Sequence, residues 1–175
     1  MTFYLILRGP LGAGKTTVAN ALARALDGRV VSIDALLERF EWDGGSEELF
    51  LRTNRLAADE VRAIAAEGRP AVVDGNFYWA RVITDLEERL AFPHATFDLR
   101  VPLRTCIERD RLRPSPYGEE AARAVFEKVE RVRAGIPVDG RRPVPETVAE
   151  NCAAVGTGAL RPPSEPTPVQ SYYMS

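Results

Sequence analysis

The sequence predicts one α/β domain in which a five-stranded parallel sheet lies between two layers of helices, as a three-layer sandwich. Two observations predict this fold. Short apolar runs alternate with longer segments whose apolar residues recur every three or four positions, as in successive β-α-β units. In addition, a chain of 175 residues with 45% hydrophobic content is large enough to cover both faces of such a sheet.

The first predicted strand and helix flank a glycine-rich loop. Residues 3–7 are an apolar run, residues 9–16 (Gly-Pro-Leu-Gly-Ala-Gly-Lys-Thr) match the P-loop motif G-x-x-x-x-G-K-[ST], and residues 17–26 favour a helix. Glycines let several backbone N–H groups point at one anion, and the following helix N-terminus attracts negative charge. We expect Lys15 to contact the β- and γ-phosphates of a nucleotide and the Thr16 hydroxyl to bind Mg²⁺. The expected nucleotide-binding residues of the loop are Gly9, Gly12, Ala13, Gly14, Lys15, Thr16 and Thr17.

Four further strands are expected after the loop. They are predicted from short, mostly apolar runs at residues 30–33, 70–73, 95–99 and 136–139. Pro137 places the last of them at an edge of the sheet, because proline cannot donate a ladder hydrogen bond. His94 is expected to begin a strand rather than to act in catalysis.

Helices are predicted between the strands from apolar residues three or four positions apart. Ser46 is a favourable N-cap for the longest helix, and Gly68 ends it. The others are expected at 34–40, at 79–91, from Pro102 onward, at 118–134 and at 146–155. After Gly156 the chain is rich in glycine and proline, so we divide it into a domain of residues 1–155 and a proline-rich tail of residues 156–175.

Composition and charge limit the classes of function. The formal net charge is −2, whereas a dedicated nucleic-acid-binding domain is usually basic. Cys106 and Cys152 lie far apart in the sequence without metal-binding spacing, so no zinc site is expected. Two isolated cysteines fit a protein of the reducing cytoplasm, which is the expected location. No apolar run approaches the roughly 20 residues that cross a bilayer, and the chain starts directly in a predicted strand. Neither a membrane anchor nor a signal peptide is therefore expected.

Asp34 is the strongest candidate outside the loop. It follows Val-Ser-Ile at the carboxyl end of the second predicted strand, where a carboxylate can face the γ-phosphate across the cleft. Phosphoryl transfer needs a group that orients the attacking hydroxyl or accepts its proton. The alternative is that Asp34 caps the next helix, and the two roles can coexist.

Asp74-Gly75-Asn76 ends the third predicted strand. Asp74 resembles a Walker B carboxylate, which would hold Mg²⁺ through water or position the substrate. Thr16 and Asp74 are the expected metal ligands. A turn is the alternative, because Asp-Gly is typical of turns. Asn76 is expected either to bind the substrate or to stabilise that turn.

An arginine-rich segment follows the fourth strand. Arg109 and Arg113 are four residues apart, so one helical face can present both guanidinium groups to a triphosphate. The alternative is a solvated run of charges. We treat residues 109–118 as a short lid.

In their order along the chain, these features resemble the P-loop kinases that phosphorylate small molecules or nucleic-acid ends. The resemblance covers about residues 3–155. It is strongest to the group of polynucleotide 5′-kinases and chloramphenicol phosphotransferase, with gluconate and shikimate kinases as more distant relatives. It implies a P-loop NTPase sheet of strand order 2-3-1-4-5, with ATP and Mg²⁺ as cofactors.

The resemblance also implies roles for single residues. Asp34 matches the aspartate that orients the acceptor or acts as base. A lid arginine closes over ATP and stabilises the transferring phosphoryl group, with Arg113 as first choice and Arg109 as second. Arg141 and Arg142 follow the fifth strand, where related kinases surround the adenine, and Arg141 is expected to bind the nucleotide.

Two further groups have open alternatives. Arg52, Arg55 and Arg62 on the long helix are expected either to dock an acidic acceptor or to form an exposed polar face. Phe77–Trp79 either line the acceptor pocket or pack in the core.

The expected function is an ATP-dependent kinase that phosphorylates a hydroxyl of a nucleoside, sugar or antibiotic. One alternative is a polynucleotide 5′-hydroxyl kinase. Another, of a different class, is a regulatory ATPase without a phosphoacceptor. The guanine-reading string N-K-x-D of GTPases is absent. The acceptor and the oligomeric state are left open.

Overall fold

The computed structural model describes residues 2–172 and contains the expected parallel sheet. Its strands run in the order β2-β3-β1-β4-β6, and every neighbouring pair is parallel. They are β1 (Tyr4–Arg8), β2 (Arg29–Ser32), β3 (Ala71–Gly75), β4 (His94–Arg100) and β6 (Ile136–Asp139). Because β6 is the fifth strand of this sheet along the chain, the predicted order 2-3-1-4-5 is confirmed, as is the edge position of the proline-containing strand.

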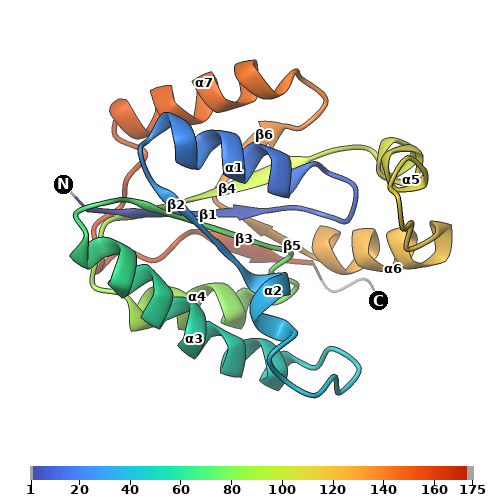
Figure 1. The fold of residues 1–175 in the computed structure, drawn as a ribbon, viewed down its shortest axis with the longest axis horizontal. Helices are drawn as coiled ribbons and strands as arrows, with labels where there is room; N and C mark the ends of the chain where they lie inside the picture. Colours follow the sequence, from blue (N-terminus) through green and yellow to red (C-terminus); the bar gives the residue numbers. More distant parts are fainter. Residues whose placement is uncertain (1, 173–175) are drawn as a thin grey trace.

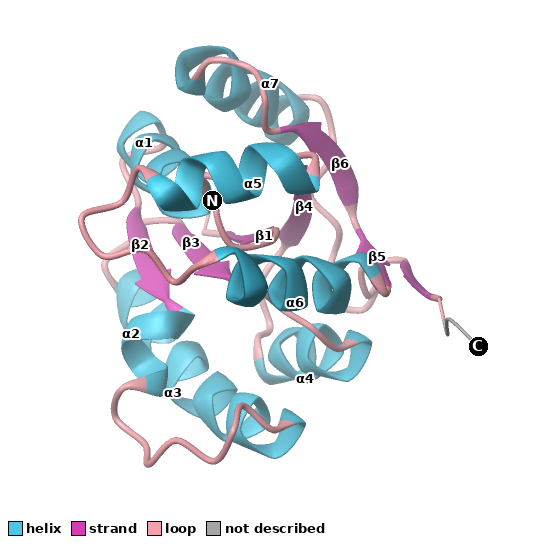
Figure 2. Cartoon of the chain, turned by 90° about the vertical axis from the view of Figure 1, so that its right-hand side faces the viewer, coloured by secondary structure: helices cyan, strands magenta, loops and turns pink. Residues whose placement is uncertain are grey.

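Helices cover both faces of the sheet (Figure 1). One layer holds α1 (Lys15–Ala25) and α7 (Val144–Gly156), and the other holds α3 (Glu47–Ala66) and α4 (Ala80–Arg89). The short α2 (Ile33–Leu37) follows β2. Figure 2 shows two further helices, α5 (Leu103–Arg111) and α6 (Glu119–Glu130), in front of the carboxyl ends of the strands.

Alternation along the strands divides the core into two clusters. In β1, Tyr4 and Ile6 face the α3–α4 layer, whereas Leu5 and Leu7 face the α1–α7 layer, and all four are fully buried. A strand buried on both faces has a continuous apolar sequence rather than an alternating one. At α3 the predicted cap is confirmed, since the Ser46 side chain accepts a hydrogen bond from the Leu49 N–H.

No helix within residues 2–172 is both long and apolar enough to cross a membrane.

The predicted helix at 118–134 is wrong at its C-terminal end. It stops at Glu130, and β5 (Val132–Ala134) then pairs antiparallel with β7 (Val169–Ser171). The two apolar residues of β5 are buried while the Arg133 between them is half-buried, which is the period of a strand rather than of a helix.

The residues after Gly156 pack against the domain, which the linker-like composition does not predict. Backbone N–H groups of His94 and Arg161 donate to each other's carbonyls, at 3.0 and 2.7 Å. The buried Thr167 shares a 2.9 Å hydrogen bond with Thr96, and its N–H donates to Glu87. This segment is held by single polar contacts to distant residues. Its sequence therefore lacks the regular spacing of apolar residues that predicts a helix or strand.

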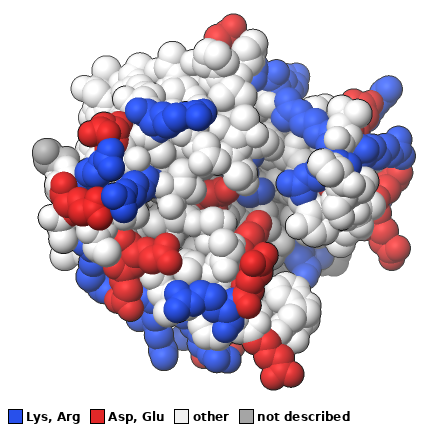
Figure 3. All heavy atoms as spheres, viewed as in Figure 1, with Lys and Arg blue, Asp and Glu red and all other residues white. Residues whose placement is uncertain are grey.

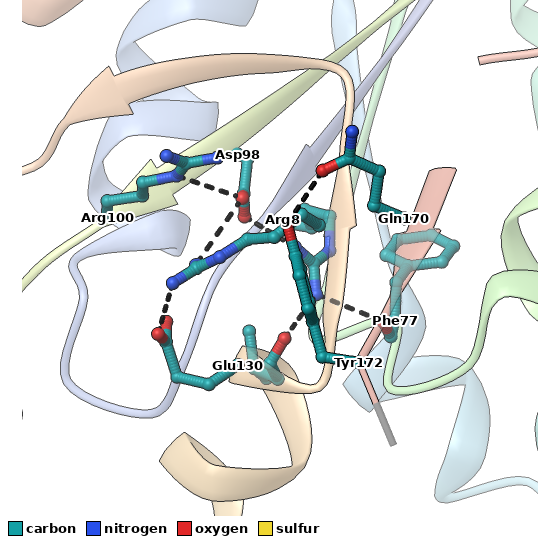
Figure 4. A network of polar contacts seen from close by, with 9 residues as sticks. Arg8, Phe77, Asp98, Arg100, Glu130, Gln170 and Tyr172 are labelled. Atoms are coloured by element: carbon teal, nitrogen blue, oxygen red, sulfur yellow. Dashed lines mark hydrogen bonds and ion pairs between the residues drawn. The ribbon is translucent and has the colours of Figure 1, made fainter. Parts of the chain in front are cut away.

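A buried ion pair joins the carboxyl ends of β1 and β4, just before the P-loop. Arg8 and Asp98 are opposed in the parallel register, are 0% and 1% exposed, and are 2.5 Å apart. Arg8 also donates to the carbonyls of Phe77 at 3.4 Å and of Val129 at 3.0 Å (Figure 4). One guanidinium group therefore connects β1 to β4, to the segment after β3 and to the end of α6.

Further charges surround this pair. Arg100 lies 3.2 Å and Arg133 lies 3.8 Å from the second oxygen of Asp98, and Arg133 also pairs with Glu130 (Figure 4). The side chains of Gln170 and Tyr172, joined by a 2.7 Å hydrogen bond, lie beside the network in the same view. The C-terminal segment thus lies next to the network that supports the P-loop.

We expect Arg8→Met to lower the free energy of unfolding by about 3 kcal/mol, because it leaves Asp98 buried with weaker partners. The double variant Arg8→Met/Asp98→Leu should recover most of that loss, since removing both charges removes the desolvation penalty. Urea denaturation measures both. Arg104→Ala, which removes an exposed pair with Glu108, is the control and should cost less than about 1 kcal/mol. A double variant no more stable than Arg8→Met would contradict this account.

Candidate nucleotide and acceptor site

A pocket of about 430 Å³ lies over the P-loop at the carboxyl edge of the sheet. It brings together residues from five separate parts of the chain. They are P-loop and α1 residues 11–18, Asp34 of α2, Asn76 after β3, the lid residues Arg109, Arg113 and Tyr117, and Gly140, Arg142, Val144 and Thr147 after β6.

The P-loop adopts the backbone conformation that its glycines were expected to provide. Gly12 has φ +78°, and a Cβ atom there would lie 2.3 Å from the carbonyl oxygen of Cys106 in α5. No other residue type fits this contact. Helix α1 begins at Lys15 with no side-chain cap and no acidic residue in its first turn. Its N-terminal N–H groups are therefore suited to a bound anion.

Lys15 is buried at the centre of the loop. Its side chain is 8% exposed, and Nζ donates to the carbonyl of Pro10 at 3.0 Å. Burial lowers the pKa of the Lys15 ammonium group, while the carboxylates of Asp74 and Asp34 oppose that shift. A phosphate group beside Lys15 would stabilise its charged form.

Thr16 and Asp74 meet as the sequence predicts. The Thr16 hydroxyl donates to Asp74 Oδ2 at 2.8 Å, and the buried Asp74 Oδ1 has no hydrogen-bond partner within residues 2–172. Burial raises the pKa of Asp74, and Lys15 and the Thr16 hydrogen bond oppose the change.

An unpartnered carboxylate oxygen beside a hydroxyl fits Mg²⁺, which binds few protein oxygens and completes its shell with water and phosphate. The described residues contain no group of three or more His, Cys, Asp or Glu side chains that could hold a metal alone.

Asp34 lines the pocket and is exposed to it. The N-cap of α2 is Ser32, whose hydroxyl accepts from the Ala35 N–H at 3.3 Å, so the capping alternative for Asp34 is wrong. In the part of the chain that the structure describes, the Asp34 side chain makes no hydrogen bond or ion pair. It is therefore available to a hydroxyl in the pocket.

Asn76 lines the same pocket and links it to Tyr78. Its Nδ2 donates to the Tyr78 hydroxyl at 3.0 Å, and its buried Oδ1 has no partner among residues 2–172. Burial, and secondarily the charge of Asp34, raises the pKa of Tyr78 to about 12. Tyr78 is therefore a neutral hydrogen-bonding group close to Asp34.

The lid arginines have different environments. Arg109 donates to the carbonyls of Ala13 and Gly140, both at 3.0 Å, and so joins the P-loop to the loop after β6. Arg113 is partly exposed and lies over the ring of Tyr117, 5.2 Å from its centroid. Arg111 pairs with Glu119 outside the pocket. Arg109 is fixed by two hydrogen bonds, whereas Arg113 is more exposed and pairs with Asp110 at 3.9 Å.

Arg141 does not reach this pocket. Its guanidinium group forms two hydrogen bonds to Asp139, at 2.9 and 2.8 Å, and the next residue, Arg142, lines the pocket instead. Arg142 also forms an ion pair with Glu150 of α7, at 3.0 Å. Of the two arginines, Arg142 is therefore the one placed to contact a ligand in this pocket.

The remaining candidates lie elsewhere. Arg52 lies over the ring of Phe40, and Arg62 pairs with Asp59, so neither lines the pocket. His94 begins β4, as predicted, and stacks on Tyr4 at the opposite edge of the sheet.

Sequence reasoning missed several residues that shape the site. They are Arg8, Asp98, Tyr117 and Gly140. A charged residue at the end of each of two apolar strands, Arg8 and Asp98, was the one signal that could have indicated a buried pair.

The surface around the site carries both signs of charge. In Figure 3 acidic and basic side chains are mixed over most of the face, and several basic ones lie on the right, where Figure 1 places α5. A continuous basic channel for a single strand of nucleic acid is not visible on this face.

Comparison with solved structures shows where this fold occurs. A gluconokinase from Sinorhizobium meliloti 1021 is 20% identical, with a TM-score of 0.71, and the alignment covers 89% of this chain and 93% of that one. Shikimate kinase from Aquifex aeolicus vf5 is 20% identical, with a TM-score of 0.64 and coverage of 91% and 98%. The tunicamycin resistance protein of Deinococcus radiodurans is 19% identical, with a TM-score of 0.65 and coverage of 93% and 99%.

A search of curated proteins gives no match. Residues 5–136 match the family AAA_33, described as an AAA domain. That match spans the P-loop, Asp34, Asp74 and the lid. The chain therefore belongs to the AAA_33 family and has the α/β fold of P-loop kinases.

Proposed function

We propose that this protein is an ATP-dependent kinase that transfers the γ-phosphoryl group to a hydroxyl of a small molecule. The observation that carries the proposal is the convergence of Lys15, Thr16 and Asp34 on one pocket, with Asp74 hydrogen-bonded to Thr16 beneath them. Structural neighbours that include a gluconokinase and a shikimate kinase support it. A nucleoside, a sugar or an antibiotic is the proposed type of acceptor, in a reducing cytoplasm that suits two free cysteines.

The residues of the pocket have different proposed roles in phosphoryl transfer. The P-loop amides and Lys15 hold the β- and γ-phosphates, and Arg109 and Arg113 cover them from the lid. Asp34 orients the acceptor hydroxyl and takes its proton as the new O–P bond forms and the bond to ADP breaks. Arg142 is proposed to lie against the adenine.

Thr16 and Asp74 are the proposed holders of Mg²⁺, which when bound neutralises charge on the β- and γ-phosphates.

If the protein is a kinase, Lys15→Ala and Asp34→Asn should both lower the rate of phosphoryl transfer, but for different reasons. Lys15→Ala should weaken ATP binding, whereas Asp34→Asn should keep ATP affinity and lower turnover by about 100-fold or more, because only acceptor activation is lost. Calorimetry with a non-hydrolysable ATP analogue and Mg²⁺ measures binding. Labelled ATP with nucleosides, sugars, hydroxylated antibiotics and 5′-hydroxyl oligonucleotides measures transfer.

Asp59→Asn is the matched control, since this aspartate is exposed on α3 and outside the pocket. Near-normal turnover of Asp34→Asn would show that the assignment of Asp34 is wrong. Release of phosphate from ATP without labelling of any acceptor would instead favour the regulatory ATPase, and labelling of oligonucleotides alone would favour the polynucleotide kinase.

Asp74→Asn should raise the Mg²⁺ concentration needed for half-maximal activity by about tenfold, because an amide is a weaker ligand than a carboxylate. Thr16 can still donate to the amide oxygen, so the fold is expected to persist. Titration of activity with Mg²⁺ measures the effect, and EDTA should abolish activity of both proteins. An unchanged Mg²⁺ requirement would remove Asp74 from the metal site.

Arg142→Ala should raise the KM for ATP by about five- to tenfold, the loss of roughly 1 kcal/mol from a cation beside a ring. Arg141→Ala, one residue away but outside the pocket, should leave that KM unchanged. Steady-state kinetics with varied ATP compares the two variants. The reverse ranking would restore the assignment made from the sequence.

A further inference from the structure

A second pocket, of about 620 Å³, lies beside the nucleotide pocket and is larger than it. Its walls come from the segment after β3, the start of α4, the end of α6 and the C-terminal segment. Figure 2 shows α6 and α4 one above the other on this side of the molecule, with β5 at their end. The volume is in the range of pockets that bind small molecules.

The charged residues of this second pocket are mostly basic. Arg81, Lys128 and Arg131 are exposed side chains of its lining, against a single acidic residue, Glu47. No ion pair involves these three cations within residues 2–172, whereas an arginine elsewhere on the surface, such as Arg104, pairs with a glutamate one turn away. The pocket therefore has an excess of uncompensated positive charge.

Its other walls are aromatic. Tyr78 and Trp79 pack edge to face, with ring centroids 5.5 Å apart, and Tyr172 also lines the pocket. Lys128 Nζ lies 5.6 Å from the centre of the Tyr78 ring. The pocket thus combines flat apolar surfaces with cations, which suits an organic molecule that carries an anionic group.

Tyr78 connects the two pockets. Its ring lines the second pocket, and its hydroxyl accepts a hydrogen bond from Asn76, which lines the nucleotide pocket beside Asp34. A molecule with a hydroxyl at Asp34 can therefore extend past Tyr78 toward the three cations.

We propose that the second pocket binds the rest of the phosphoryl acceptor, and that this acceptor is a hydroxyl compound carrying a phosphate monoester. The proposal rests on the kinase function proposed above. Two guanidinium groups and an ammonium group match a phosphate dianion better than a single carboxylate. Transfer from ATP then yields ADP and a product with two separate phosphate groups.

The test compares acceptors that differ only in their anionic group. A panel of nucleosides and sugars is assayed with labelled ATP as neutral compounds, as phosphate monoesters and as carboxylates. Phosphate monoesters should have a kcat/KM about tenfold or more above the neutral compounds. In Arg81→Ala/Arg131→Ala the KM for the monoester should rise about tenfold or more, while the KM for ATP stays within about twofold.

Arg24→Ala/Arg123→Ala removes two exposed arginines outside both pockets and should change neither constant. Equal use of neutral and phosphorylated acceptors, or no response to Arg81→Ala/Arg131→Ala, would overturn this inference and leave the kinase function intact. A preference for carboxylates would overturn the assignment of phosphate.

If no panel member is labelled, calorimetry with the monoesters and the ATP analogue separates the two proposals. Monoester binding that Arg81→Ala/Arg131→Ala abolishes supports the second pocket while the kinase function fails, and no monoester binding overturns the inference.

Discussion

The buried ion pair between Arg8 and Asp98 is the interaction on which the functional edge of the sheet depends. Parallel pairing of β1 with β4 places the two residues opposite each other where both strands end. Two charges removed from water are tolerated only when each satisfies the other, so their geometry is closely constrained. Because Arg8 also binds the carbonyls of Phe77 and Val129, the chain enters the P-loop from a backbone that is held on several sides.

The nucleotide pocket contains charges that are incomplete without a ligand. Burial shifts the pKa of Lys15 down and that of Asp74 up, so each group is moved toward its neutral form. Asp74 Oδ1 and Asn76 Oδ1 are buried acceptors without partners in the described chain. Groups like these cost free energy in the folded protein, and such costs are concentrated at functional sites. A phosphate beside Lys15 and a cation beside Asp74 would offset the free-energy cost at these two residues.

The C-terminal segment shows how an irregular stretch can contribute to a binding surface. It crosses the amino edge of β4, where Arg161 and Thr167 hold it, and then returns to pair β7 with β5. That return places Tyr172 in the lining of the second pocket, which Tyr78 also lines. A proline-rich segment suits this path, because its prolines need no donor partners, while Arg161 and Thr167 find theirs in β4 and α4.

The sequence by itself determined the P-loop with its strand and helix and the parallel sheet, because glycine spacing and apolar runs are local properties of the chain. It also predicted Lys15, Thr16, Asp34 and Asp74 as site residues. Only the tertiary structure decided where α6 ends, how the tail runs, that Arg8 meets Asp98, and that Arg142 rather than Arg141 faces the nucleotide pocket. These outcomes depend on contacts between residues far apart in the chain. They also depend on side-chain direction, which differs between consecutive residues and is set by the neighbours that pack against them.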